Sequence, residues 1–377
     1  MTQTLLPFAT EAVETPAPAG LAALMGGTID EGKDVEYRQL GCKTVVGKCS
    51  NPAMPFKYSV NPYRGCEFAC RYCYARYTHE FMELEDPLAF ERTIYAKTGA
   101  ADAAARDLAR RDFRGRGIAI GTVTDPYQPA ERRFRIARGI LEKMAERPGL
   151  DVSITTKSAL VLRDLDLLRR ISERSRLSVN VSLITLDAKL ARRLEPRAPT
   201  PDLRLETLAS LRAEGVAAGL FAMPVLPGLT DAPADLRALV RRAKESDALW
   251  VKGSALFLPS AARKVFYPFL EKEFPGLLRR YRAVFDRATR SSIDYRLRLA
   301  GFIDDLCRAE GVPVGIQGQL ARTGSTRTHA SLPFGDPSGP KSDASEGVRV
   351  GRWAAPGADG IGPEVALGGT NEKTPLL

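Results

Sequence analysis

Three closely spaced cysteines are the feature of this sequence that points most directly to chemistry. The segment from Asn61 to Arg76 reads NPYRGCEFACRYCYAR and contains Cys66, Cys70 and Cys73. Thiolates are soft ligands that favour zinc, copper(I) or an iron–sulfur cluster. Structural zinc sites are normally closed by four protein ligands, whereas a cubane cluster held by three cysteines keeps one iron open. The spacing therefore predicts a metal or cluster site with one open coordination position.

Four further motifs accompany this segment and carry a resemblance to a known family. They are TDPYQPAE at 124–131, ITTKS at 154–158, LEPRAPTP at 194–201 and PVLPGLTD at 224–231. Together with the cysteine spacing, they resemble the radical S-adenosylmethionine (SAM) enzymes. Within that superfamily they are similar to the spore photoproduct lyase-like branch, whose members are often labelled DNA repair photolyases.

The resemblance implies the cofactors and the type of reaction. It places a [4Fe–4S] cluster on the three cysteines and SAM on the open iron, with a reductant such as flavodoxin or ferredoxin as the electron donor. Reduction by one electron would cleave SAM to methionine and a 5′-deoxyadenosyl radical, which takes a hydrogen atom from a substrate. The cofactor carries the difficult chemistry in such enzymes, and the protein positions it and excludes water.

Four residues take the positions of family residues that contact SAM or the radical. Lys157, at the end of an apolar strand, resembles the lysine that binds the SAM carboxylate. Ser182 resembles a serine that contacts the carboxylate or ribose, although a small residue filling a tight layer of the fold is an alternative. Tyr72 resembles the aromatic residue that packs against adenine, and Tyr74 resembles a tyrosine implicated in hydrogen-atom return. Both tyrosines could instead brace the cysteine loop.

The remaining polar candidates each have a structural alternative. TDPYQPAE takes the place of the glycine-glycine-glutamate motif of many radical enzymes, so Thr124, Asp125 and Glu131 are candidates to accept hydrogen bonds from the SAM ammonium. Glu131 could equally be an acidic first-turn residue that complements a helix dipole. Glu195 and Arg197 could contact the ribose or substrate, or could form a structural ion pair.

Two other motifs are assigned positioning roles. The turn containing Pro224, Pro227 and Gly228 is expected to shape the adenine pocket through backbone atoms. His79 lies six residues after Cys73 and could be a fourth ligand. A fourth protein ligand would close the open iron, so we expect His79 to have a capping role beside the cysteine loop instead.

The sequence departs from spore photoproduct lyases at the expected hydrogen donor. Those enzymes have a cysteine near the end of the second strand, where this chain has Thr122. Simple reversal of a thymine dimer is therefore not expected. Cys42 and Cys49 could approach the site as donors, but their spacing fits no familiar metal motif. We expect small hydrophobic roles for both, and for Cys307.

Short apolar runs alternate with amphipathic helical stretches through the middle of the chain, which indicates βα units around a parallel sheet. Six strands are predicted, at 56–60, 117–123, 151–156, 177–185, 217–225 and 249–257. This pattern fits a closed barrel or a doubly wound sheet, and the family resemblance implies an open (β/α)6 partial TIM-type barrel. The motifs follow strand ends, where active sites of parallel α/β folds gather.

Composition sets the boundaries of the fold and the cellular setting. The chain has 377 residues, 44% of them hydrophobic and 27% charged, as expected for one large globular domain. We predict a core domain at 35–315, a disordered N-terminal segment at 1–34 and a Gly/Pro-rich disordered tail at 316–377. The six cysteines do not suggest a secreted disulfide framework, and no membrane span is evident. We therefore expect a cytoplasmic protein.

The formal net charge of +10 could draw the protein to nucleic acid. Acidic residues are interspersed among the arginines on amphipathic helices, so the charge alone does not define a groove. The main prediction is a radical SAM enzyme, lyase-like, with DNA as a candidate substrate. The alternative is a non-enzymatic zinc or iron–sulfur protein that binds nucleic acid through its basic surface. The sequence specifies neither the substrate nor the oligomeric state.

Overall fold

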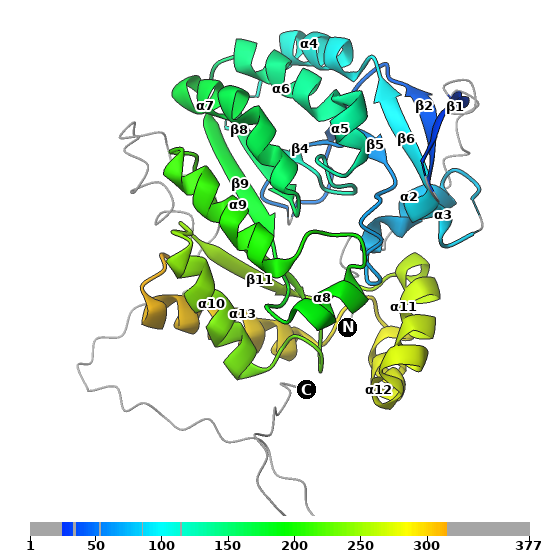
Figure 1. The fold of residues 1–377 in the computed structure, drawn as a ribbon, viewed down its shortest axis with the longest axis vertical. Coiled ribbons are helices and arrows are strands. Elements are labelled where there is room, and N and C mark those ends of the chain that lie inside the picture. Colours follow the sequence, from blue (N-terminus) through cyan, green and yellow to red (C-terminus); the bar gives the residue numbers. More distant parts are fainter. Residues whose placement is uncertain (1–24, 33–34, 53, 85, 114, 315–377) are drawn as a thin grey trace, which may run out of the picture. The chain divides into compact units, whose positions relative to one another are not determined.

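The computed structural model describes residues 25–32, 35–52, 54–84, 86–113 and 115–314 (Figure 1). The tail predicted at 316–377 lies outside these residues, and so do residues 1–24 of the N-terminal segment predicted at 1–34. Residues 25–32 of that segment, predicted to be disordered, form a β-strand instead. None of the helices in the described ranges combines the length and apolar character that a membrane crossing requires.

A seven-stranded sheet is the centre of the fold, in the order β11-β10-β9-β8-β7-β4-β3. Its strands are β3 (Val46–Lys48), β4 (Tyr58–Val60), β7 (Ile118–Ile120), β8 (Asp151–Thr156), β9 (Arg176–Ser182), β10 (Ala218–Val225) and β11 (Val251–Ala255). The six strands from β4 to β11 are parallel, and each lies within, or within one residue of, a predicted strand. β3 adds an antiparallel edge. The mixed α/β class is thus confirmed and the sheet is not closed, while the partial TIM-type barrel stays a prediction.

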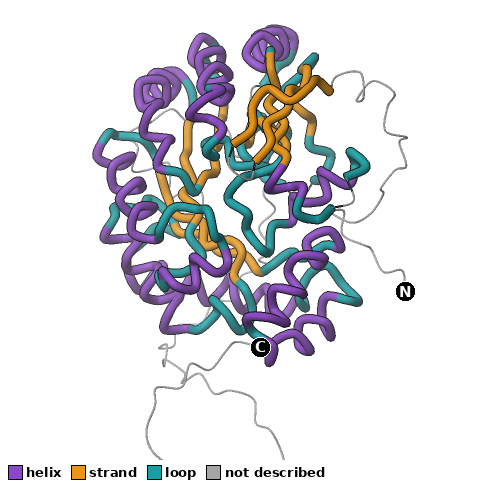
Figure 2. The backbone as a smooth tube through the Cα atoms, turned by 45° about the vertical axis from the view of Figure 1, so that its right-hand side comes forward, coloured by secondary structure: helices purple, strands orange, loops and turns teal. Residues whose placement is uncertain are grey.

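Helices form an outer layer around these strands (Figure 2). The longer ones are α4 (Ala100–Arg110), α6 (Ile136–Glu146), α7 (Leu165–Arg174), α9 (Pro201–Ala213), α10 (Pro233–Glu245), α11 (Ser260–Glu273), α12 (Pro275–Phe285) and α13 (Ile293–Glu310). The shorter ones are η1 (Tyr74–Arg76), α2 (Tyr77–Glu80), α3 (Ala89–Arg92), α5 (Ala130–Phe134), η2 (Ala159–Asp164) and α8 (Ala188–Leu194). Helix α9 shows how the sequence starts a helix: the Thr200 hydroxyl accepts from the Leu203 amide, and Pro201 occupies the first turn.

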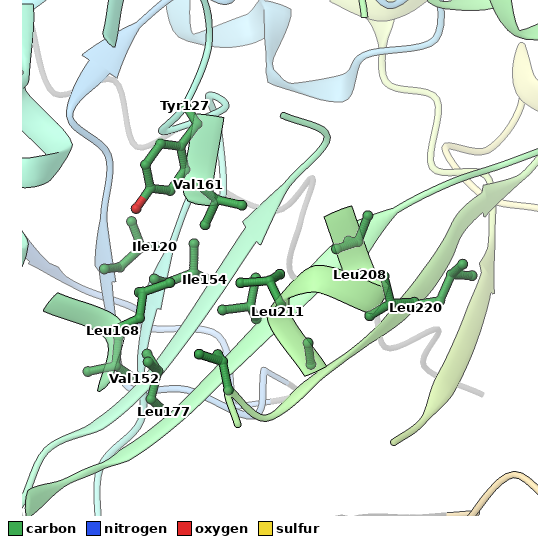
Figure 3. Packing of buried hydrophobic residues seen from close by; sticks show 14 of the residues in the cluster. Ile120, Tyr127, Val152, Ile154, Val161, Leu168, Leu177, Leu208, Leu211 and Leu220 are labelled. Atoms are coloured by element: carbon green, nitrogen blue, oxygen red, sulfur yellow. The ribbon is translucent and has the colours of Figure 1, made fainter. Parts of the chain in front are cut away.

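The main core lies between the parallel sheet and its helices (Figure 3). Val152, Ile154 and Leu220 from the strands are fully buried, and so are Leu168 and Leu208 from the facing helices. Buried residues occupy alternate positions of β8, whereas β10 is a nearly continuous apolar run. Each such side chain contributes about 1.5–3 kcal/mol of burial free energy. This core fixes the positions of the carboxyl ends of the strands, from which the motif segments start.

A second, four-stranded sheet has the order β1-β2-β6-β5 and was not predicted. Its strands are β1 (Met25–Gly32), β2 (Val35–Gly41), β5 (Tyr63–Arg64) and β6 (Thr93–Thr98). One face, with Tyr63, Ile94 and Ala96, packs against Ala130 and Phe134 of α5. The short edge strand β5 leads directly into the cysteine segment, so this sheet fixes where that segment begins.

Candidate functional site

The cysteine loop, residues 66–73, runs from β5 to η1 and is held by backbone hydrogen bonds. The Cys66 amide donates to Phe90 O at 2.9 Å, and the Cys73 amide donates to Cys70 O at 3.2 Å. The Arg71 amide donates to Leu194 O at 2.9 Å, which ties the loop to the end of α8. The loop is therefore anchored to helices α3 and α8.

All three thiols are unpaired and lie in an apolar environment. Cys66 and Cys70 are buried and Cys73 is partly buried. Burial raises the pKa of each thiol, that of Cys70 to about 12. Such thiols need a strong positive charge to become thiolates, and bound iron supplies one. In the described part of the chain, no three His, Cys, Asp or Glu side chains are arranged to bind one metal ion. Cysteines of a cluster each bind a different iron, and this donor set fits that chemistry.

Gly65, immediately before Cys66, has a conformation that only glycine adopts easily. Its φ is +83°, and a Cβ there would lie 2.8 Å from Phe90 O and 2.9 Å from Thr93 O. We predict that Gly65→Ala lowers the free energy of unfolding by about 2 kcal/mol and displaces the cysteine loop, so that iron binding falls.

Urea unfolding and iron content after reconstitution measure both effects. Gly99 is the matched control, because its φ of +75° is similar but nothing lies within 4 Å of its Cβ position. Gly99→Ala should cost only about 1 kcal/mol and leave the iron content unchanged. Equal iron binding by the Gly65→Ala and Gly99→Ala variants would contradict this role of Gly65.

The TDPYQPAE segment connects the cysteine loop with the end of β8. Thr124 Oγ1 donates to Gly65 O at 2.6 Å. Asp125 accepts from Thr156 Oγ1 at 2.7 Å and from the Lys157 amide at 2.8 Å. Burial raises the pKa of Asp125, and these hydrogen bonds oppose the rise. The structure therefore brings Thr124, Asp125 and Lys157 together beside the cysteine loop.

Glu195 lies at the centre of a buried polar cluster, which we call the Glu195 cluster (Tyr72, Lys157, Glu195 and Arg204). It is fully buried, and its carboxylate pairs with Arg204 Nη2 at 2.6 Å and with Lys157 Nζ at 3.7 Å. The Tyr72 hydroxyl donates to the same carboxylate. Burial alone would raise the pKa of Glu195, but the two cations outweigh it and the net direction is downward. Glu195 is therefore a buried anion already committed to three neighbours.

Lys157 is the exception within this cluster. Its side chain is 17% exposed, and among the described residues its ammonium makes no hydrogen bond, only the 3.7 Å ion pair with Glu195. Burial alone would lower the pKa of Lys157, but Cys70 and Glu195 raise it above its ordinary value. The ammonium is thus charged, close to the cysteine loop, and has hydrogen-bond capacity left for another anion.

Glu131 is accounted for by protein contacts alone. It is fully buried and accepts from Tyr63 Oη at 2.6 Å, Arg163 Nη2 at 2.8 Å and the Ala137 amide at 2.9 Å. An amide at the start of α6, that of Arg138, adds a fourth bond at 3.1 Å. Glu131 lies in the first turn of α5, as expected from its alternative role, and it also accepts from the start of α6. Its contact with the SAM ammonium stays a prediction.

The other SAM candidates lie at strand ends or in turns. Ser182, the last residue of β9, is buried and its hydroxyl donates to Met223 O at 3.5 Å. Pro227 O accepts from Tyr281 Oη at 2.7 Å. Gly228 has φ +73° and donates to Asp231 Oδ1 at 2.8 Å. Arg197 Nη1 donates to Glu91 O at 3.4 Å, so it does not form the suggested ion pair with Glu195.

Tyr74 and Thr122, the two predicted catalytic positions, are in direct contact. The Tyr74 hydroxyl donates to the backbone oxygen of Thr122. The Thr122 hydroxyl accepts from Asn61 Nδ2 at 3.0 Å, and the ring of Tyr74 packs against Phe257. Asn61 and Thr122 follow β4 and β7, and Phe257 follows β11. Residues after the first and the last of the six parallel strands in the sheet therefore meet at Tyr74.

His79, Cys42 and Cys307 have contacts within the protein that do not involve the cysteine loop. His79 is buried, with Nε2 3.0 Å from Thr93 O, and burial lowers its pKa to about 4. Cys42 donates to Thr44 O at 3.2 Å, and Cys307 is buried in the main core. Cys49 is partly buried beside β3.

Several residues of the site were not predicted. Gln128 is fully buried and bridges the loop, accepting from the Glu67 amide at 2.9 Å and donating to Gly65 O at 3.2 Å. Arg76, which pairs with buried Glu91, donates to Cys70 O at 3.0 Å. Gln128 and Arg76 both lie within the motifs quoted from the sequence. What could have identified them is that each is a polar residue in a segment expected to be buried.

Comparisons with known proteins identify the superfamily of the chain. Residues 60–240 match the model of the Radical SAM superfamily. An uncharacterized protein of Mycobacterium tuberculosis (strain H37Rv) is 36% identical over 263 residues, 70% of this chain and 77% of that protein. An uncharacterized protein of Methanocaldococcus jannaschii is 31% identical over 179 residues, 46% of this chain and 62% of that protein.

Among solved structures, spore photoproduct lyase complexed with dinucleoside spore photoproduct aligns with a TM-score of 0.48 at 15% identity, covering 73% of this chain and 78% of that chain. Streptococcus suis SuiB bound to S-adenosylmethionine aligns with a TM-score of 0.35 at 14% identity, covering 59% of this chain and 44% of that chain. The matched family segment contains the cysteine loop, Asp125, Lys157 and Glu195. The chain belongs to the radical SAM superfamily.

Proposed function

We propose that this protein is a radical SAM enzyme in which Cys66, Cys70 and Cys73 hold a [4Fe–4S] cluster and Lys157 binds the carboxylate of SAM. When bound and reduced by one electron, the cluster and SAM together supply a 5′-deoxyadenosyl radical that abstracts hydrogen from the substrate. The electron comes from an external reductant such as a flavodoxin or ferredoxin. The residues of the chain hold, orient and shelter these groups.

The observation that carries the proposal is the unused hydrogen-bond capacity of Lys157 next to the cysteine loop. Glu195 is held by Arg204 and Tyr72, so it keeps Lys157 charged without taking up its three N–H donors. An ammonium in this state favours a carboxylate from a ligand. The open iron position predicted beside it is the place where the amino acid part of SAM binds in this family.

The neighbouring residues have supporting roles in the proposal. Asp125 fixes the backbone of Lys157, and Thr124 fixes the start of the cysteine loop, so both act as positioning residues. Ser182 and the turn at Pro227 and Gly228 are assigned to the ribose and adenine side. Tyr72 contributes the edge of the site nearest to Glu195.

The substrate half of the proposal rests on Tyr74 and Thr122. The motifs place the chain near the spore photoproduct lyase-like branch, with DNA as a candidate substrate. Thr122 occupies the position where those lyases have a cysteine. An alcohol O–H bond is stronger than a thiol S–H bond, so the Thr122 hydroxyl is a poorer hydrogen-atom donor. Tyr74, in contact with Thr122, is the residue we assign to hydrogen return.

We predict that Lys157→Met weakens SAM binding while the cluster stays in place. A charge-assisted hydrogen bond contributes about 1.5–3 kcal/mol, so the Kd should rise about 10- to 150-fold. Equilibrium dialysis with SAM measures the Kd, and iron content with the visible absorption spectrum reports the cluster.

Lys252→Met is the matched control, since Lys252 is another partly buried lysine at a strand, with Asp304 as its nearby anion. It should leave SAM binding unchanged. An unaltered Kd in the Lys157→Met variant with the cluster intact would refute the assignment of Lys157 to the carboxylate.

A further inference from the structure

The face of the small sheet opposite to α5 carries two neighbouring cations. In the β5–β6 pairing, Arg64 lies opposite Tyr95, and Tyr63 lies opposite Ala96. Because side chains alternate along a strand, Arg64, Tyr95 and Lys97 share one face. Lys97 is the diagonal neighbour of Arg64, at a spacing that long side chains can bridge. This face therefore places a guanidinium beside an ammonium, immediately before the cysteine loop.

Neither cation has an anionic partner in the described part of the chain. Both side chains are partly buried, yet neither Arg64 nor Lys97 forms an ion pair or a side-chain hydrogen bond there. On the same face, Arg38 is neutralised by Glu36 at 2.8 Å. Two partly buried like charges without compensation are costly, and a bound anion would remove that cost.

The electrostatics agree with uncompensated charge. The pKa of Lys97 is lowered to about 8, mainly by burial, with Cys42 opposing the fall and Arg64 adding to it. The pKa of Tyr77, in α2, is raised by burial, and Arg64 opposes that rise, so its hydroxyl lies near the same guanidinium.

A buried neutral donor completes the set. Tyr95 is 0% exposed, and its hydroxyl has no partner with full hydrogen-bond geometry among the described residues. The Arg38 guanidinium lies near its oxygen and can only donate, so the hydroxyl proton has no acceptor. Burial raises the pKa of Tyr95, and Arg38 and Arg64 both oppose that rise. An oxygen-rich anion bound to Arg64 and Lys97 would give this hydroxyl the partner that it lacks.

We propose that Arg64, Lys97 and Tyr95 form a binding site for a phosphate group. The planar fork of arginine and the three donors of lysine match the several oxygens of phosphate. Two cations match the charge of a phosphate monoester, whereas a single carboxylate would leave one of them uncompensated. The phosphate could be inorganic, part of a mononucleotide, or the terminal phosphate of a polynucleotide. The site does not depend on the proposed function, although its position next to Cys66 would bring a phosphorylated substrate to the cysteine loop.

Protection of Lys97 from acetylation tests this site. A lysine with a lowered pKa reacts readily with acetylating reagents at mildly alkaline pH. The full-length protein with its reconstituted cluster is acetylated in a phosphate-free buffer, with and without inorganic phosphate at constant ionic strength, and mass spectrometry follows each lysine. When phosphate exceeds its Kd tenfold, labelling of Lys97 should slow about tenfold. Lys252, whose pKa is also lowered by burial, should label at an unchanged rate.

Further arms separate the sources of phosphate. Adenosine 5′-monophosphate is compared with adenosine, and a 5′-phosphorylated oligonucleotide with the same oligonucleotide lacking that phosphate. Protection by the phosphorylated member of either pair supports the site and identifies the source. Equal labelling of Lys97 under all conditions, or equal protection of Lys252, would overturn the proposal.

Calorimetry gives a second measurement that does not need a reactive lysine. Lys97→Met should abolish the heat of phosphate binding, and Arg64→Lys, which keeps the charge but loses the fork, should weaken it. Phosphate binding that is unchanged in Lys97→Met, or undetectable in the unaltered protein, would also overturn it. None of these measurements uses SAM, so they are independent of the test of Lys157.

Discussion

Replacement of Cys70 by serine is expected to abolish SAM cleavage. Serine keeps the size of the side chain but is a poor ligand for iron, so the cluster should be lost or remain incomplete. Cleavage of SAM to 5′-deoxyadenosine should fall at least about a thousandfold, because the cluster delivers the electron and no side chain can replace it. Iron content, the visible spectrum and product formation after anaerobic reconstitution measure the effect.

Cys42→Ser provides the matched control. Cys42 is partly buried, and its thiol donates a hydrogen bond to Thr44 O that a serine hydroxyl can keep. This variant should bind a full complement of iron and cleave SAM at the normal rate. A Cys70→Ser protein that still assembles the cluster and cleaves SAM would contradict the assignment of the loop.

Glu195→Gln is expected to destabilise the fold strongly. The carboxylate is fully buried between Arg204 and Lys157, and Arg204 is itself only 1% exposed. Removing the charge from one partner leaves a buried guanidinium uncompensated, which costs about 3 kcal/mol. The pKa of Glu195 is lowered in the folded protein. The stabilisation is therefore fully present above the ordinary pKa of a glutamate, and it is lost as the pH falls from there through the lowered pKa of Glu195. Urea unfolding at neutral and acidic pH measures both effects.

Glu245→Gln serves as its control. Glu245 pairs with Arg242 at 3.4 Å, but both side chains are about half exposed, at 58% and 47%. Exposed pairs contribute little to stability, so this variant should unfold at nearly the same urea concentration as the unaltered protein. If both glutamine variants unfold alike, the Glu195 cluster does not have the stabilising role described.

The parallel sheet could be predicted because its signal is local. Ala218–Val225 is an apolar run, and Asp151–Thr156 alternates half-buried polar residues with buried residues that include Val152 and Ile154. Both segments lie between amphipathic helices, and these local patterns predict strands. The small sheet could not be predicted in this way. β5 has only two residues, and β6 reads TIYAKT with Lys97 inside it. Their pairing depends on contacts between segments about 30 residues apart.

The site shows the same division. Strand ends predicted Asp125 and Lys157, because carboxyl ends of parallel strands meet at one edge. Adjacency in the sequence suggested Arg197 as the partner of Glu195, but the partner is Arg204, in the next helix. The motif predicts Glu131 as an acceptor for SAM, and the fold shows that α6, Tyr63 and Arg163 already donate to its carboxylate. Sequence motifs located the site, and the hydrogen-bond partners required the three-dimensional fold.

The phosphate-binding face illustrates what pairing adds. Arg64 and Lys97 are more than thirty residues apart in the sequence, and nothing local relates them. Only the register of β5 on β6 makes them neighbours. A substrate that carries a phosphate would then have a point of attachment next to the cysteine loop, separate from Lys157.

Product analysis of a single reduction tests the central claim most directly. The protein is reconstituted anaerobically with iron and sulfide, reduced with dithionite in the presence of SAM, and the products are separated by chromatography. We predict 5′-deoxyadenosine and methionine in equal amounts, with none formed by the Cys70→Ser variant. A protein that instead binds one zinc ion at these cysteines and forms no 5′-deoxyadenosine would contradict the proposal.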